Sequence, residues 1–220
     1  TAEQDLTRSR LASERMDAMI GDLTPVVADA TLADRPVLVV VAPGAAAEEV
    51  DAVTESISAA GGIAAGRIRL TDRAVDPEVD AELAALVANL PLGTAPAADA
   101  DLGTQLGTAI GRAALLRGED AEPHLEDDDR ATVLTTLADA ELIEYEAGSV
   151  RPGQLAVIVT GPVVEESTAL RIAALARTLD AEGAGAVVVS GIGSGGGQDA
   201  LVVLRSSGQE DVSTVDSGNL

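Results

Sequence analysis

A glycine-rich stretch is the part of this sequence whose spacing most resembles a chemical motif. Residues 187–205 read VVVSGIGSGGGQDALVVLR, in which Gly191, Gly193 and Gly196 satisfy the pattern G-x-G-x-x-G. In dinucleotide-binding domains such glycines let the backbone approach a pyrophosphate, and the following helix N-terminus stabilises its charge. The first question is therefore whether the chain is a nucleotide-binding enzyme.

The position of this stretch argues against nucleotide binding. A dinucleotide fingerprint belongs to the first strand–helix turn of the fold, whereas this stretch follows roughly the fifth expected strand. The first such turn, residues 41–45, has a single glycine, and its Pro43 removes an amide donor. Asp216 does lie at the distance expected of a ribose-binding acid. We predict that residues 191–197 form a turn, and a nucleotide-binding enzyme stays open as an alternative.

The remaining candidate residues form no pattern typical of a catalytic site. His124 is the only imidazole, and it lies in an acidic stretch, residues 119–129, without the spacing of a calcium loop. Ser190 is not in a G-x-S-x-G motif, and the absence of cysteine excludes thiolate chemistry and disulfides. We therefore predict a non-enzymatic protein without a bound cofactor. The acidic stretch is expected to be solvated, with Asp128 or Asp129 capping the next helix.

Copper binding is a second alternative. Protein ligands of copper are mainly His, Met and Cys side chains. This chain offers His124, Met16 and Met19, and these three side chains would all have to converge. We therefore predict no metal site.

The composition excludes nucleic acid as a partner. The 220 residues carry a net charge of −23, with 14 arginines and no lysine, so the chain repels phosphate backbones. Phe and Trp are absent, which removes the usual stacking platforms for bases. The core must therefore be aliphatic. The sequence contains no run of about 18 apolar residues, the length that would predict a membrane-spanning helix.

Strand and helix patterns alternate along residues 35–220, which we expect to form a single domain. The class predicted is α/β, with a doubly wound, mostly parallel, Rossmann-like sheet of about five or six strands. Strands are expected at 37–41, 63–70, 142–145, 155–160, 186–189 and 212–215, and helices at 48–60, 76–90, 101–116, 130–140, 165–179 and 199–205. Asp76 is expected to cap the helix that begins with Pro77.

Residues 1–34 are predicted to form a helical stem. Ala12, Met16, Met19, Leu23, Val26 and Ala30 recur at the alternating three- and four-residue spacing of a coiled-coil seam. The stem is either a helix lying on the domain or the base of a longer coiled coil. In the second case Met16, Met19 and Leu23 would bind a partner or a second copy of the chain.

A stripe of three glycines marks the helix predicted at 101–116. Gly103, Gly107 and Gly111 recur every four residues and therefore share one helix face. Each costs about 1 kcal/mol inside a helix, so a close backbone approach is expected to compensate. The approaching element is either another part of the chain or a partner protein, and the stripe is our second candidate for partner binding.

With these elements in order, the chain resembles the MctB/SteB family of actinobacterial envelope proteins. The resemblance rests on ADRPVLVVV at 33–41, AELIEY at 140–145, VIVTG at 157–161 and STVD at 213–216. It implies an extracytoplasmic α/β domain on a coiled-coil stem, anchored to the cytoplasmic membrane by an N-terminal helix that precedes this sequence.

The resemblance also implies two functions. Members of the SteB kind act in septal cell-wall assembly with a SteA-like protein and a peptidoglycan hydrolase, whose coiled coil could pair with the stem. The name "copper transporter" given to the family implies copper homeostasis or efflux. We expect the first function, because the residues offer a helical seam and few copper ligands.

Overall fold

The computed structural model describes residues 32–97, 99–118, 121–161, 165–190 and 213–216. Its centre is a six-stranded sheet in the order β5-β2-β1-β6-β7-β8. The strands are β1 (Pro36–Val41), β2 (Ile63–Leu70), β5 (Ile143–Glu144), β6 (Leu155–Thr160), β7 (Ala186–Ser190) and β8 (Ser213–Asp216). Every neighbouring pair is parallel except β2 with β5. The predicted α/β class and mostly parallel sheet are confirmed.

One helix, α2 (Ala47–Ala59), covers the first face of the sheet. It forms the crossover between the parallel strands β1 and β2. Its Val50 and Ile57 pack on Val37, Val39 and Val41 of β1. Gly61, at φ +81°, follows the helix and lets the chain turn back into β2. The strand–helix–strand unit predicted for residues 37–70 is confirmed.

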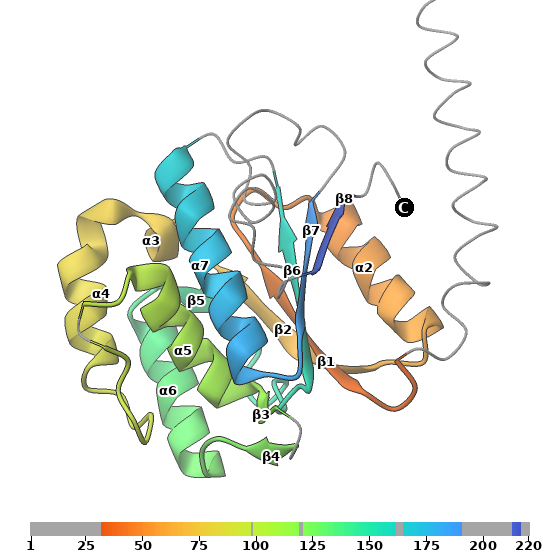
Figure 1. Ribbon diagram of the computed structural model, residues 1–220, viewed down its shortest axis with the longest axis horizontal. Coiled ribbons are helices and arrows are strands. Elements are labelled where there is room, and N and C mark those ends of the chain that lie inside the picture. The colour runs from red at the N-terminus through yellow and green to blue at the C-terminus, as the bar shows by residue number, and fades with distance from the viewer. Residues whose placement is uncertain (1–31, 98, 119–120, 162–164, 191–212, 217–220) are drawn as a thin grey trace, which may run out of the picture.

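The opposite face carries the larger core, under α5 (Leu102–Ala114), α6 (Asp127–Asp139) and α7 (Glu166–Glu182) (Figure 1). Leu38 of β1, Ile68 of β2 and Ile158 of β6 point to this side and are fully buried. Because successive strand residues point to opposite faces, β1 supplies both cores. Asp101 caps α5 by accepting a bond of 2.9 Å from the Thr104 amide.

Three segments differ from the sequence-based prediction. The helix expected at 76–90 is a 3₁₀ turn, Pro77–Val79, followed by α4 (Asp80–Val87), and a further short helix, α3 (Asp72–Val75), precedes them. Asp76 does cap the 3₁₀ turn, since its Oδ1 accepts from the Glu78 amide at 2.8 Å. The acidic stretch, which we expected to be a solvated loop, contains a short strand, since β4 (Glu122–Pro123) pairs antiparallel with β3 (Leu116–Arg117).

The cap predicted for the following helix is also wrong. Asp128 and Asp129 lie inside the first turn of α6, which begins three residues before the predicted start and has Glu126 at its N-cap position. The three aspartates of the first turn still stabilise this end of α6 through the helix dipole. Acidic residues are common both at the N-cap and in the first turn, so the sequence alone does not separate the two positions.

Candidate functional site

The ends of β1 and β6 are where a doubly wound sheet normally binds its ligand. The chain leaves β1 toward β2 on one side and leaves β6 toward β7 on the other, so the order of the strands reverses between them. Here the two loops touch through their backbones: a side chain at Gly161 would overlap the carbonyl of Gly44 and meet the Ala45 nitrogen at 2.8 Å. At Gly44 and Gly161 the two loops therefore meet main chain to main chain, with no room for a side chain between them.

The glycine stripe does not form a partner surface, which corrects one of the two sequence-based interpretations. Gly103, Gly107 and Gly111 are buried against α7 of the same chain. A side chain at Gly103 would overlap the carbonyl oxygen of Arg171, and one at Gly107 would meet Thr178 Cβ at 2.8 Å. The stripe lets two helices approach closely, and this packing offsets the helix-propensity cost of the glycines.

His124 is held in a network of side chains rather than in a solvated loop. Its Nε2 lies 2.8 Å from the Glu182 carbonyl and its Nδ1 lies 3.5 Å from Glu182 Oε2. Arg112 of α5 donates from Nε to Glu182 at 3.2 Å and from NH1 to the carbonyls of Leu92 and Thr94. This network ties the end of α7 to α5 and to the hairpin, which is a structural role.

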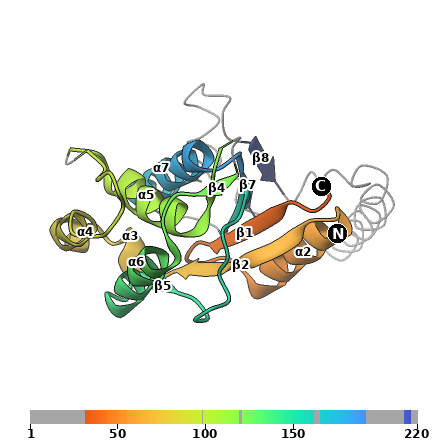
Figure 2. The same ribbon diagram turned by 90° about the horizontal axis from the view of Figure 1, so that it is seen from below.

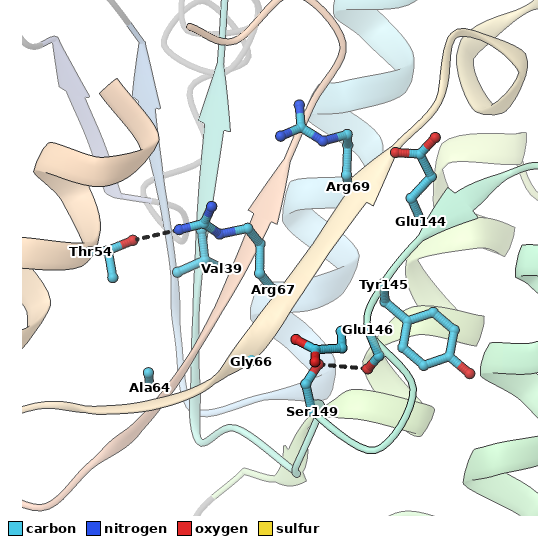
Figure 3. Close-up of a pocket in the computed structure, with 10 residues that line it drawn as sticks. All are labelled: Val39, Thr54, Ala64, Gly66, Arg67, Arg69, Glu144, Tyr145, Glu146 and Ser149. Carbon is cyan, nitrogen blue, oxygen red and sulfur yellow. Dashed lines mark hydrogen bonds between the residues drawn. The ribbon is translucent and has the colours of Figure 1, made fainter. Parts of the chain in front are cut away.

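An open groove of about 590 Å³ lies on the α2 face, beside the short strand β5. Ten residues line it: Val39, Thr54, Ala64, Gly66, Arg67, Arg69, Glu144, Tyr145, Glu146 and Ser149 (Figure 3). The groove exists because α2 reaches only part of this face, while β5 pairs with β2 at just two residues, Arg69 and Leu70. The face of β2 that carries Arg67 and Arg69 is therefore only partly covered.

A bulge in β2 shapes the floor of the groove. Val37 pairs with Ala64 but Leu38 pairs with Gly66, so Ala65 is the extra residue. Gly66 has φ +129°, and a side chain there would meet Val150 Cα at 2.8 Å. The loop after β5 therefore crosses β2 at this point, where the Arg151 amide donates to the Ala65 carbonyl at 2.7 Å.

The walls of the groove carry charges of both signs. Arg67 and Arg69 stand on one face of β2, and Glu144 and Glu146 follow on β5 and the loop after it (Figure 3). Arg67 NH2 lies 3.3 Å from Thr54 Oγ1 and 3.7 Å from Asp51 Oδ1. Tyr145 borders the groove, but its ring points away, and its hydroxyl lies 3.4 Å from Thr135 Oγ1 of α6.

Sequence reasoning missed this groove, although one signal was present. The alternation Arg67-Ile68-Arg69-Leu70 predicts two arginines on one face of a strand. The sequence does not say that α2 leaves that face open, and this depends on where the helix lies.

Several predicted site residues lie outside the described residues. They are Met16, Met19 and Leu23 of the stem, the glycine motif at 191–197 and the helix expected at 199–205. Within the described ranges, no three His, Asp or Glu side chains gather closely enough to hold a metal ion. The same ranges contain no helix long and apolar enough to cross a membrane.

The sheet order defines an α/β protein of the doubly wound class, and its groove lies away from the usual ligand position of that class. The chain belongs to the family whose model is described as "Copper transport outer membrane protein, MctB", which matches residues 1–219. The family resemblance seen in the sequence is thereby confirmed.

Curated relatives carry the same name. The proteins called "Copper transporter MctB" from Mycobacterium tuberculosis (strain H37Rv) and Mycobacterium bovis are each 27% identical to this chain. Each of these matches covers 98% of the chain and 71% of the relative. The protein of that name from Mycobacterium leprae is 28% identical over 80% of this chain and 59% of its own length.

Proposed function

We propose that this chain is a non-enzymatic binding domain of the cell envelope that acts through protein partners. One contrast carries the proposal: at the position where such a sheet binds small ligands the Gly44 and Gly161 backbones approach closely, while a groove with charged walls lies open on the α2 face. An enzyme of this class would use that position. A protein-binding domain needs an accessible surface instead.

The stem completes this proposal. In the proposed arrangement residues 1–34 pair with a coiled coil through Met16, Met19 and Leu23, and the α/β domain contacts a SteA-like protein. The chain would lie outside the cytoplasmic membrane, held by an anchor helix that precedes it, and its work would belong to septal cell-wall assembly. The family's description as an outer membrane protein supports a location beyond the cytoplasmic membrane, and the heptad spacing supports the pairing.

The stem is tested by replacing Met16, Met19 and Leu23 together with Asp. We expect the triple variant to lose self-association in sedimentation experiments and to lose binding to a SteA-like protein or to a hydrolase coiled coil, because buried carboxylates break an apolar seam. The α/β domain, residues 35–220, which we call the head, should keep the wild-type melting temperature. Unchanged association of the triple variant would contradict the proposed role of the stem.

Copper handling is the second candidate, favoured by the name that the relatives carry. In the described residues the nearest approach to a donor set is His124 with Glu182, which are two ligands and already engaged with each other. A copper site would therefore need donors from elsewhere, such as Met16 and Met19. Titration calorimetry with Cu⁺ and Cu²⁺ on the wild type and on a His124→Ala, Met16→Leu, Met19→Leu variant decides between the two candidates.

A further inference from the structure

The groove on the α2 face presents two pairs of opposite charges that do not neutralise one another. Arg69 and Glu144 are direct partners in the antiparallel pairing of β2 with β5. Residues in this relation have Cβ atoms about 5 Å apart, which suits an ion pair. Yet neither side chain makes a hydrogen bond or an ion pair within the part of the chain that the structure describes.

The neighbouring charges of the groove, Arg67 and Glu146, have only weak partners or none: Arg67 NH2 donates to Thr54 Oγ1 at a long 3.3 Å. Arg67 is 43% exposed, and its contact with Asp51 is a long surface pair of 3.7 Å, which contributes little. The Glu146 backbone carbonyl accepts from Ser149 Oγ at 2.6 Å, whereas its carboxylate has no partner among the described residues. Two guanidinium groups on β2 and two carboxylates on β5 and the loop after it therefore line one hollow (Figure 3).

This arrangement selects against a ligand of one sign. An anion would be attracted by Arg67 and Arg69 but repelled by Glu144 and Glu146, and a cation would meet the reverse. A ligand with both charges gains on both walls. The two arginines form a row on β2, and the two glutamates form a row on β5 and the loop after it, with Arg69 directly opposite Glu144. In an extended peptide, side chains two residues apart point the same way and are separated by nearly 7 Å, whereas neighbouring strands lie about 5 Å apart. An acidic and a basic side chain at this spacing can therefore each reach one row.

We propose that this groove binds an extended peptide segment of a partner protein in which an acidic and a basic side chain are two residues apart. The acidic side chain contacts Arg67 and Arg69, and the basic one contacts Glu144 and Glu146. The volume of about 590 Å³ lies within the usual range of ligand sites. This inference rests on the proposed function, since it names the surface by which the head would contact its partner.

Three blocked tripeptides test the charge requirement. Acetyl-Glu-Ser-Lys-amide carries both charges, while acetyl-Glu-Ser-Gln-amide and acetyl-Gln-Ser-Lys-amide each carry one. In a titration of the ¹⁵N-labelled full chain, we expect the doubly charged peptide to shift the amide resonances of Arg67, Arg69 and Glu144 in a saturable way. Each singly charged peptide should bind about fivefold more weakly, the upper end for an exposed ion pair.

Matched variants locate the site. Arg69→Gln and Glu144→Gln should each weaken the doubly charged peptide about fivefold, whereas Arg117→Gln, an equal charge change on β3 away from the groove, should leave binding unchanged. No shift with the doubly charged peptide, equal affinity for all three peptides, or an Arg69→Gln variant that binds like the wild type would each overturn the inference.

The same measurements separate this inference from the proposed function. If the peptides fail to bind while the stem still associates with its partners, only the groove is wrong. If the peptides bind as expected but neither head nor stem associates with any partner protein, the groove keeps its specificity and the proposed function fails.

Discussion

The two faces of the sheet are built from the same strands but are covered to different extents. On the face of α5, α6 and α7, Leu38, Ile68 and Ile158 are fully buried in a continuous aliphatic core. On the face of α2, Val157 is only partly buried, and Arg67 and Arg69 stand in an open groove. Figure 2, turned from the first view, shows the helices unevenly divided between the two sides.

The difference teaches where stability and binding reside in this molecule. The three-helix face removes most apolar area from water, and area removed from water is the main source of folding free energy. The α2 face leaves charged side chains exposed with weak partners or none, which contributes little to stability but keeps these side chains available for binding. Substitutions on the first face should therefore change the free energy of unfolding, and those on the second should change association.

The largest expected effect on stability comes from a comparison of two consecutive residues of β7. Val188 is fully buried on the three-helix face, whereas Val187 is partly exposed on the α2 face. We expect Val188→Ala to lower the free energy of unfolding by about 2.5 kcal/mol, through lost burial and a cavity, and Val187→Ala by about 1 kcal/mol. Urea denaturation of both variants measures this, and equal losses would contradict the contrast between the faces.

The next effect concerns the close contact of α5 with α7. Gly103→Ala should cost about 2 kcal/mol, because the added methyl overlaps the fixed carbonyl of Arg171 and forces the helices apart. Gly111→Ala should cost less, because it meets Glu182, with Cβ at 2.9 Å and Cγ at 3.2 Å, and Glu182 is the last residue of α7, where a small shift disturbs only the end of the helix. Thermal melts rank the two variants, and the reverse order would show that α7 itself yields.

A smaller effect is expected at the start of α5. Asp101→Ala removes the acceptor of the Thr104 amide and of the Thr104 hydroxyl, which lie 2.9 and 2.7 Å from the carboxylate. Loss of such an N-cap costs about 1 kcal/mol. Asp101→Asn retains an acceptor oxygen and serves as the control in the same denaturation series.

The smallest effect on stability is expected in the groove. Arg69→Gln should change the free energy of unfolding by less than about 0.5 kcal/mol, because Arg69 is exposed and has no ion pair in the described structure. A loss above 1 kcal/mol would mean that the guanidinium stabilises the sheet. The α2 face would then contribute to stability as the three-helix face does, contrary to the proposed contrast.

The sequence predicts the sheet well because apolar runs bounded by turn residues carry most of that information. β1, β2 and β6 begin and end within one residue of the prediction, and Asp76 is a capping residue as expected, although the element that it caps is a 3₁₀ turn. Sequence patterns fail to predict features that depend on how the elements are placed in space. The carboxylates at the start of α6 suggest a cap but act through the dipole, and His124 looks solvated in the sequence although only 11% of its side chain is exposed.

The functional surface was harder to predict for the same reason. The glycine stripe indicated a close approach, yet only the position of α7 shows that the approach is made within the chain. The four groove charges are ordinary surface residues in the sequence. They become a site because the bulge at Gly66 brings the loop after β5 across the strand and because α2 stops short of them.

The central pairing of β1 with β6 has a consequence for how the chain folds. β1, α2 and β2 are contiguous and can assemble as soon as they have been synthesised. The other edge of β1 must wait until everything from α3 to β5 has emerged, because Val37 pairs with Leu155. Contacts so distant along the chain form slowly. Until then the Val-rich strand Pro36–Val41 has one edge whose backbone groups are unpaired. Such an exposed edge makes the partly synthesised chain prone to aggregation.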